Sequence, residues 1–332
     1  MIEVRNVQVS YGSFEAVHGV SFDVTDGEFF TLLGPSGCGK TTTLRSIAGF
    51  ETVSGGQILL NGRDIAPLSP EERDIGFVFQ NYALFPSMTV HDNIAFGLKI
   101  RHVRKAEAEE RIQEMARMIG IEEHLTKKIS QISGGQQQRV AIARALITRP
   151  CLLLMDEPLS NLDAKLRVSM RSEIKRIQKE LGIVAIYVTH DQEEAMAISD
   201  RIAVFNQGRI EQIGTPREIY RHPASEFTAR FVGEINEIED PGFISRHSTA
   251  SLAGRIFVRP EKVHLCRERG AVPEHACAFP ARIIEQEFLG AATRNILSAE
   301  GNRISSLSYE NDSFDAGQEV WAWFDAGDVT VL

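Results

Sequence analysis

The sequence predicts an α/β fold over residues 1–232, followed by a small all-β domain over residues 233–332. Three observations lead to this prediction. Short apolar strands alternate with amphipathic helices between residues 152 and 205, a pattern typical of a parallel sheet covered on both faces. A mostly helical stretch covers about residues 88–148. After residue 233 the helical periodicity fades, and β-like runs separated by Gly, Pro and Asn predict a barrel-like β domain.

Taken in order, residues 2–33 predict short strands of an antiparallel β subdomain, because apolar residues alternate and Asp26-Gly27 supplies a turn. A compact apolar run at 29–33 predicts a buried strand, and a helix begins at Lys40. Residues 58–60, followed by Asn61-Gly62, predict a hairpin. Further strands are expected at 75–79, 152–155, 183–189 and 202–205, and further helices at 166–181, at 191–198 and from Pro216.

Composition excludes several classes of protein. Hydrophobic residues make up 43% and charged residues 24% of the 332 residues, which argues against disorder, collagen and coiled coil. Residues 1–232 hold 27 Lys and Arg against 29 Asp and Glu, and residues 233–332 hold 9 against 16. The net charge of −9 is therefore divided into −2 and −7. A general nucleic-acid binder needs a basic face, so we expect no nucleic-acid partner.

The cysteines and the lengths of the apolar runs indicate the cellular compartment in which the protein is expected. The four cysteines form no CxxC pair, which fits a reducing compartment better than a disulfide scaffold. The N-terminus does not resemble a signal peptide, and no apolar run approaches the roughly 20 residues of a membrane span. We expect a soluble chain that reaches a membrane only through a partner.

A glycine-rich loop carries the first chemical signal. Residues 34–41 match G-x-x-x-x-G-K-[ST] between a predicted strand and a predicted helix, the pattern of a P-loop nucleotide site. Backbone N–H groups and the helix start favour a phosphate there. Lys40 is expected to reach the β- and γ-phosphates and Thr41 to hold Mg²⁺; the alternative is a turn without a ligand. The expected nucleotide contacts are Gly34, Ser36, Gly37, Cys38, Gly39, Lys40, Thr41 and Thr42.

Two adjacent carboxylates, Asp156 and Glu157, end a strongly apolar strand. Asp156 suits Mg²⁺, directly or through water. Glu157 is placed to act as a general base on an attacking water. The alternative, that the two residues only cap the next turn, loses weight once the phosphate loop is present.

A third motif makes the prediction specific. Residues 132–139, Ile-Ser-Gly-Gly-Gln-Gln-Gln-Arg, resemble the signature of ATP-binding cassette (ABC) ATPases, with Ile132 where the family usually has Leu. A helix start here would again suit a phosphate, although an ordinary Ser N-cap is the alternative. The signature residues are Ser133, Gly134, Gly135 and Gln136.

The resemblance covers residues 1–232 and implies further roles. Tyr11 stands where the family stacks an aromatic ring on adenine, and Gln80 where the Q-loop contributes to Mg²⁺ and its water. Asp163 belongs to a D-loop, and His190, as in the H-loop, holds the γ-phosphate and positions the water. Taken singly, these four residues are expected more often as a packed strand aromatic, a surface amide, a helix N-cap and a loop histidine.

The resemblance also implies cofactors and partners. ATP and Mg²⁺ would be bound between the phosphate loop of one subunit and the signature of another, in a head-to-tail homodimer. Residues 81–90, 191–196 and 258–263 resemble ATPase subunits of bacterial importers with a C-terminal TOBE domain. These subunits lie on the cytoplasmic face of the inner membrane and work with two integral-membrane permease subunits and, indirectly, an extracytoplasmic solute-binding protein. Gln80 and the segment to Met88 would pass closure on to the permeases.

The solute and the alternatives follow from smaller features. Residues 231–236 favour a polyamine, with ferric iron, sugar or another solute also compatible. The alternative function is a non-transport ABC ATPase acting on the ribosome or nucleic acid. Such relatives usually carry two cassettes or long coiled-coil insertions, which this sequence lacks.

Lys127 and Ile132 depart from the family pattern. Finally, the helix start could lower the pKa of the Cys38 thiol, or Cys38 could simply be a small residue that fits.

Overall fold

The computed structural model describes residues 1–240, 242–247, 254–309 and 314–332. The chain forms two compact units, Met1–Pro216 and Arg217–Leu332. This boundary lies 16 residues (232 − 216) before the division that the sequence suggested. Arg259, a buried residue of the second unit, ties much of this stretch to that unit. Its guanidinium donates hydrogen bonds to four carbonyl oxygens that follow Pro216, those of Tyr220, Ala229, Gly233 and Glu234.

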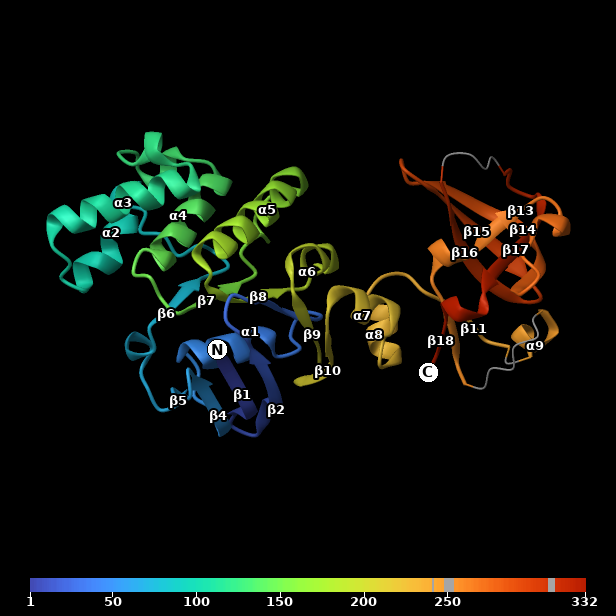
Figure 1. Ribbon diagram of the computed structural model, residues 1–332, viewed down its shortest axis with the longest axis horizontal. Helices are drawn as coiled ribbons and strands as arrows, with labels where there is room; N and C mark the ends of the chain where they lie inside the picture. Colours follow the sequence, from blue (N-terminus) through green and yellow to red (C-terminus); the bar gives the residue numbers. More distant parts are fainter. Residues whose placement is uncertain (241, 248–253, 310–313) are drawn as a thin grey trace. The chain divides into compact units, whose positions relative to one another are not determined.

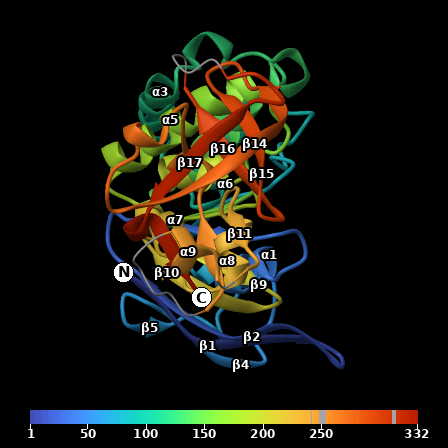
Figure 2. The same ribbon diagram turned by 90° about the vertical axis from the view of Figure 1, so that its right-hand side faces the viewer.

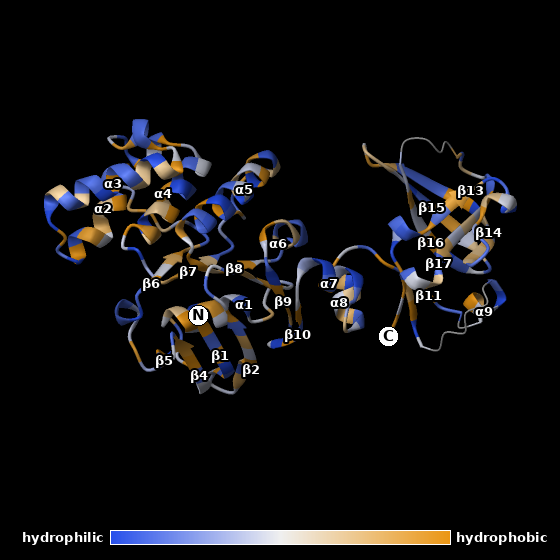
Figure 3. Ribbon diagram, viewed as in Figure 1, coloured by the Kyte–Doolittle hydropathy of each residue, from blue (hydrophilic) through white to orange (hydrophobic). Residues whose placement is uncertain are grey.

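A mixed, mostly parallel sheet forms the centre of the first unit, in the order β10-β9-β3-β8-β7-β6 (Figure 1). Its parallel strands are β3 (Phe29–Leu33), β6 (Ile75–Val78), β7 (Leu152–Asp156), β8 (Val184–Thr189) and β9 (Arg201–Asn206), and β10 (Arg209–Gly214) is antiparallel to β9. Figure 3 shows β7 and β8 as mostly hydrophobic. They are apolar because both faces of the sheet are covered, which confirms the predicted α/β class.

An antiparallel sheet forms a second layer of this unit, in the order β2-β1-β4-β5 (Figure 2). Its strands are β1 (Ile2–Tyr11), β2 (Phe14–Val24), β4 (Gly55–Leu60) and β5 (Arg63–Asp64). The predicted hairpin joins β4 and β5. Asn61 and Gly62 have φ values of 51° and 79°, the left-handed conformation that a two-residue type I′ turn requires.

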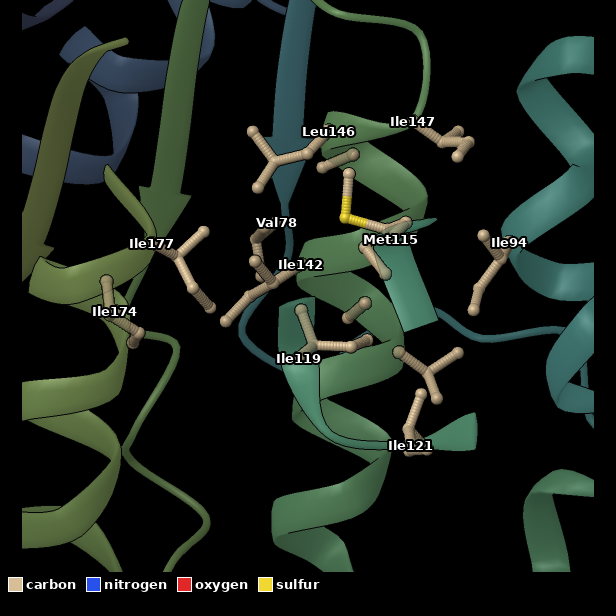
Figure 4. Packing of buried hydrophobic residues seen from close by; sticks show 14 of the residues in the cluster. Val78, Ile94, Met115, Ile119, Ile121, Ile142, Leu146, Ile147, Ile174 and Ile177 are labelled. Atoms are coloured by element: carbon tan, nitrogen blue, oxygen red, sulfur yellow. The ribbon is translucent and has the colours of Figure 1, made fainter. Parts of the chain in front are cut away.

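The predicted helical stretch holds α2 (Val90–Ile100), α3 (Lys105–Ile119) and α4 (Gly134–Leu146), with single 3₁₀ turns at Glu122–His124 and Ile129–Gln131. Another 3₁₀ turn, Pro70–Glu72, precedes β6. Ile142 and Leu146 of α4 pack among side chains of α2, α3, α5 (Ala164–Leu181) and β6 (Figure 4). The helical subdomain therefore shares one core with α5 and the parallel sheet.

Alternate residues of β7 show how both faces of the sheet are buried. Leu153 and Met155 belong to the core under α2–α5. Leu152 and Leu154 belong to the opposite core, which includes α1 (Lys40–Ala48) and the antiparallel sheet. Because successive side chains of a strand point to opposite faces, β7 contacts both cores. Its carboxyl end therefore lies between α1 and the helical subdomain. The last helix of the central region is α6 (Gln192–Ile198), which follows β8.

The second unit is mainly β structure. Its described sheets have the orders β11-β12-β18 and β13-β17-β14-β15-β16, both antiparallel. The strands are β11 (Asn236–Ile238), β12 (Ile256–Val258), β13 (His264–Cys266), β14 (Ala276–Phe288), β15 (Thr293–Ala299), β16 (Asn302–Ser308), β17 (Glu319–Asp325) and β18 (Val329–Val331). The helices are α7 (Pro216–Arg221), α8 (Glu226–Phe231) and α9 (Phe243–His247), with 3₁₀ turns at Pro260–Lys262, Arg269–Ala271 and Ala326–Asp328. Phe279 and Phe324 lie in its core.

No helix among the described residues is long and apolar enough to cross a membrane.

Candidate active site

The phosphate loop joins β3 to α1, as the sequence predicted, and its shape depends on glycine. Gly39 is the N-cap of α1 and has φ 101°. A Cβ added there would lie 2.8 Å from the carbonyl oxygen of Ala16, and one added at Gly34 would lie 2.4 Å from that of Phe205. The first turn of α1 holds no acidic residue. Its positive end is therefore left for an anion.

Lys40 lies inside this loop, and its side chain is almost fully buried. Its ammonium donates hydrogen bonds of 2.7 Å to the carbonyl oxygens of Gly34 and Pro35. The ammonium group of Lys40 is therefore held inside the loop. In a P-loop, the backbone N–H groups surround a phosphate in this space.

Thr41 and Asp156 link the loop to the end of β7. The hydroxyl of Thr41 donates a 2.8 Å hydrogen bond to Oδ1 of Asp156, and Nη2 of Arg45 lies 3.6 Å from Oδ2. Burial raises the pKa of Asp156, while the Thr41 hydrogen bond and Arg45 act in the opposite direction. A hydroxyl and a buried carboxylate beside a phosphate loop are oxygen ligands of the kind that Mg²⁺ prefers, with nucleotide phosphates completing its shell.

Glu157 lies between Gln80 and His190. Its Oε2 accepts a 3.2 Å hydrogen bond from Nε2 of Gln80, and its Oε1 lies 3.2 Å from Nδ1 of His190. Its φ is 42°, a left-handed conformation that costs free energy in a residue with a side chain. Hydrogen bonds hold it there: its amide donates to Val188, and the amide and hydroxyl of Ser160 donate to its carbonyl. Gln80 contacts this carboxylate rather than Thr41 or Asp156.

The signature residues begin α4. Ser133 is the N-cap, its hydroxyl accepts from the amide of Gln136, and Oε1 of Gln136 accepts from the amide of Ser133. The alternative of a Ser N-cap is thus correct as local structure, and it is compatible with an anion site. Gly135 packs closely on α5, because a Cβ there would lie 2.9 Å from Cδ2 of Leu166. Ser133 and Gly134 are exposed.

Asp163 lies where its structural alternative, a helix N-cap, would place it, whereas Tyr11 does not match its own alternative of a packed strand aromatic. Tyr11 ends β1 and is 47% exposed. Partial burial and a hydrogen bond to Glu51 raise the pKa of its hydroxyl, and Thr42 of α1 hydrogen-bonds to it as well. Its hydroxyl is therefore near the phosphate-loop helix. Asp163 is the N-cap of α5 and accepts from the amide of Leu166.

The surroundings of Cys38 contradict one of the two expectations for it, a lowered thiol pKa. The thiol is 4% exposed and lies 3.6 Å from Nζ of Lys40. Burial raises the pKa of Cys38 more strongly than Lys40 lowers it. The suggested lowering of its pKa is therefore wrong, and a small apolar residue that fits under the loop is the better description.

Sequence reasoning missed three residues around this site. Asn161 donates from Nδ2 to the carbonyl of Gln80 at 2.9 Å. Arg144 of α4 donates to the carbonyls of Tyr82 and Ala83, both at 2.8 Å. Arg167 of α5 joins the segments on either side of the site and is described further below. No local motif identifies these contacts, because Asn161 and Arg144 bind backbone carbonyls distant in sequence and Arg167 binds the distant carboxylates of Asp191 and Glu194.

The chain matches two families. The ABC transporter family matches residues 17–160, and the TOBE domain family matches residues 256–332. These ranges correspond to the phosphate-loop unit and to most of the second unit.

Curated relatives match almost the whole chain. An uncharacterized ABC transporter ATP-binding protein, y4fO of Sinorhizobium fredii, is 50% identical over 320 residues, 96% of this chain and 92% of that protein. The sn-glycerol-3-phosphate import ATP-binding protein UgpC of Rhodopseudomonas palustris is 46% identical, covering 87% of this chain and 81% of that protein. The spermidine/putrescine import ATP-binding protein PotA of Thermotoga maritima is 40% identical, covering 99% and 95%.

Solved structures agree with this result. The structure of cbiO1 from Clostridium perfringens, part of the ABC transporter complex cbiONQ, has a TM-score of 0.62 and 30% identity and covers 67% of this chain and 91% of that one. A dimeric, post-hydrolysis ATP-binding cassette bound to ADP and Pi has a TM-score of 0.59 and 32% identity, covering 65% and 99%. With the phosphate loop, the paired carboxylates and the signature helix in place, the chain belongs to the ABC transporter family, as an ATP-hydrolysing subunit of the import type with a TOBE domain.

Proposed function

We propose that the site holds Mg²⁺-ATP with its phosphates in the loop of residues 34–41. The observation that carries this proposal is the arrangement of Lys40, Thr41 and Asp156 around the start of α1. Lys40 and the backbone N–H groups of residues 37–41 bind the β- and γ-phosphates. Thr41 and Asp156 hold Mg²⁺, which neutralises charge on the phosphates. Tyr11 stacks on the adenine, as the family resemblance implies, and its hydroxyl lies near Thr42 of α1.

Glu157 is the general base in this proposal. A water between the γ-phosphate and Glu157 gives its proton to the carboxylate as it attacks phosphorus, and ADP leaves. The two contacts of 3.2 Å to Gln80 and His190 fix the direction of the carboxylate. Gln80 also contributes to the Mg²⁺ shell once nucleotide is bound, which requires its amide to turn from Glu157. His190 holds the γ-phosphate on the side of the attacking water.

The chain carries one phosphate loop and one signature, so a head-to-tail homodimer completes two ATP sites. The start of α4 supports this proposal, because its first turn holds no acidic residue and Ser133 and Gly134 are exposed. A second helix N-terminus adds positive potential at the γ-phosphate, where one lysine and one helix start leave charge unmatched. Asp163 and its neighbours in the D-loop lie beside Leu166, on which the signature glycine Gly135 packs.

An apolar cavity of about 440 Å³ follows Gln80 and is the proposed contact with the permeases. Its aromatic residues are Phe77, Phe79, Phe85 and Phe96, and the rings of the first two contact each other in a tilted arrangement with a centroid separation of 4.5 Å. Phe50, which is 46% exposed, contacts both of these rings. An apolar, aromatic-lined surface suits a short amphipathic helix of a membrane protein. Its occupant would press on the segment that continues from Gln80 to Met88.

We infer that two permease subunits dock on the dimer at the cytoplasmic face of the inner membrane, with a solute-binding protein outside. The relatives described above import sn-glycerol-3-phosphate or spermidine and putrescine. Of the solutes that we expected, a polyamine recurs among them, and ferric iron does not. We therefore propose a small solute, with polyamines first. The acidic charge of residues 233–332 and the family match do not favour action on the ribosome or nucleic acid.

Phosphate release by the purified chain tests this proposal. With Mg²⁺-ATP, wild type should release phosphate, and Lys40→Met should release none above background. Lys175→Met is the matched control, because Lys175 pairs with Asp200 at 2.8 Å, at the far end of α5. Equal rates for wild type and Lys40→Met would overturn the proposal, whereas loss in Lys175→Met alone would place the active site elsewhere.

A further inference from the structure

Arg167, in the first turns of α5, reaches two loops of the active site with one guanidinium. Its Nη2 donates a 3.2 Å hydrogen bond to the carbonyl oxygen of Leu162, in the D-loop. Its Nη1 donates a 3.1 Å hydrogen bond to Oδ2 of Asp191, directly after His190. Its Nε lies 3.6 Å from Oε1 of Glu194. No role in the proposed function has so far been given to this arginine.

On the His190 side, Arg167 contacts a network that holds both neighbours of the histidine. Asp191 caps α6, because its Oδ1 accepts from the amide of Glu194 at 3.0 Å. The hydroxyl of Thr189 accepts from the amide of Asp191 at 3.0 Å and donates to Oε2 of Glu194 at 2.8 Å. His190 therefore lies between two residues whose positions are fixed by hydrogen bonds.

Glu194, at the centre of this network, is buried, so its charge needs a partner. Glu194 is 4% exposed, and its Oε2 also accepts a 2.7 Å hydrogen bond from the hydroxyl of Tyr187. Burial and the nearby Glu194 hold the pKa of Tyr187 well above its usual value, so the tyrosine stays a donor. Arg167 supplies a cation to both Asp191 and Glu194. A carboxylate buried without such a partner would be costly and would move toward solvent.

On the other side, Leu162 belongs to a segment that is itself tied to Gln80. Asn161 donates to the carbonyl oxygen of Gln80 at 2.9 Å. Arg167 thus joins the D-loop, which carries Asp163 and is hydrogen-bonded to Gln80, to the loop that carries His190. A cavity of about 50 Å³ lies at this junction and is lined by Glu157, His190, Arg167 and Glu194, among others.

The linkage contains one loose contact. Among the described residues, Nε of Arg167 has no hydrogen-bond partner, although it is buried and Glu194 is 3.6 Å away. The cavity beside it has room for about one water molecule. A small shift of α6 toward α5 would close this contact and carry His190 with it.

We propose that Arg167 is a positioning residue for hydrolysis: it sets His190 relative to Glu157 by tying the loop of residues 189–191 to the D-loop. The proposal rests on the function proposed for His190 and goes beyond it, since Arg167 acts through the loop of residues 189–191 rather than on the nucleotide. The planar guanidinium is needed because two acceptors in different directions must be held at once, which a single ammonium does poorly.

The test compares steady-state ATP hydrolysis by wild type, Arg167→Met, Arg167→Lys and the control Lys175→Met. We expect kcat of Arg167→Met to fall about 10- to 100-fold, the size expected for a misplaced catalytic group, with the KM for ATP changed less than about threefold. Arg167→Lys should be intermediate. Because Arg167 acts through His190, adding Arg167→Met to His190→Ala should lower the single-turnover rate little further. Lys175→Met, on the same helix, should keep the wild-type kcat.

Asp191→Asn is a second variant, used if Arg167→Met unfolds at a lower temperature than Lys175→Met. It keeps an oxygen for the α6 cap but removes the charge that faces Arg167, and we expect the same selective fall in kcat. The inference is overturned if His190→Ala loses activity while both Arg167→Met and Asp191→Asn keep the wild-type kcat, or if only KM rises. If His190→Ala itself keeps the wild-type rate, the proposed role of His190 fails instead, and this outcome is distinguishable from the first.

Discussion

Nδ1 of His190 lies 3.2 Å from Oε1 of Glu157, although 33 positions separate the two residues in the sequence (190 − 157). They meet because β7 and β8 are parallel neighbours, and each residue directly follows the carboxyl end of its strand. The same strand ends place Gln80, shortly after β6, on the other oxygen of Glu157. This relationship leads to the first prediction.

Glu157→Gln should slow ATP hydrolysis by about 10²- to 10⁴-fold, because the amide cannot accept the proton of the attacking water. ATP binding should persist, since Lys40, Thr41 and Asp156 are unchanged. Size measurement with Mg²⁺-ATP should therefore show a stable dimer that wild type forms only transiently. Glu173→Gln on α5 is the control and should hydrolyse at the wild-type rate. A Glu157→Gln variant that hydrolyses normally would show that another group is the base.

Asp156→Asn should stabilise the nucleotide-free chain while abolishing Mg²⁺-dependent hydrolysis. Burial raises the pKa of Asp156 in the folded state above its unfolded value. The folded state then binds this proton more tightly, so stability falls as the pH rises from the unfolded pKa through the folded one. Above that window the ionised Asp156 costs free energy, and asparagine removes this cost.

The measurement for Asp156→Asn is thermal unfolding without nucleotide in a series from pH 4 to pH 8. The melting temperature of the variant should rise relative to that of wild type as the pH increases from the usual aspartate pKa of about 4. A lower melting temperature for the variant at pH 8 would contradict the prediction.

Arg144→Met should loosen the segment between Gln80 and Met88. Tyr82 and Ala83 have φ values of 62° and 46°, and Arg144 holds the carbonyls of both. Losing these hydrogen bonds should reduce the free energy of unfolding by about 1–3 kcal/mol. Amide hydrogen exchange across residues 80–88 should accelerate. Arg101→Met is the control: Arg101 pairs with the exposed Asp74, so exchange in this segment should stay at the wild-type rate.

Arg259→Met should destabilise the second unit selectively. Its guanidinium serves four carbonyls and stacks on Tyr220, with 4.3 Å between Cζ and the ring centroid. Leaving these acceptors without a donor should cost about 3 kcal/mol or more. Limited proteolysis should cut residues 217–332 earlier than in wild type, while ATP binding by the first unit persists. Arg303→Met, which breaks only an exposed pair with Glu285, should digest as wild type does.

Local sequence rules predicted most of the fold and several of the contacts. The type I′ turn at Asn61-Gly62, the N-cap at Ser133 and the N-cap at Asp163 were all predictable, because each depends on residues within four positions. The phosphate loop was predictable for the same reason, since its glycines and Lys40 act together within eight residues. Asp156 and Glu157 followed from an apolar strand that ends in carboxylates.

Long-range features were harder to predict. Arg259, which ties residues 220–234 to the second unit, binds acceptors between 25 and 39 positions away in sequence. The pKa of Cys38 depends on how deeply the loop buries the thiol, which the neighbouring Lys40 did not reveal. Arg144 and Arg167 bind backbone carbonyls or distant carboxylates, which no local motif identifies.

The sequence by itself determined the elements, the phosphate loop, the signature and the family resemblance, because backbone conformation and phosphate binding are set by neighbouring residues. Only the tertiary structure decided that Glu157 meets both Gln80 and His190, and that Arg167 ties the D-loop to the loop of residues 189–191. The physical reason is the order of the parallel strands. It brings the ends of β6, β7 and β8 to one edge of the sheet, where side chains far apart in sequence come within hydrogen-bond distance.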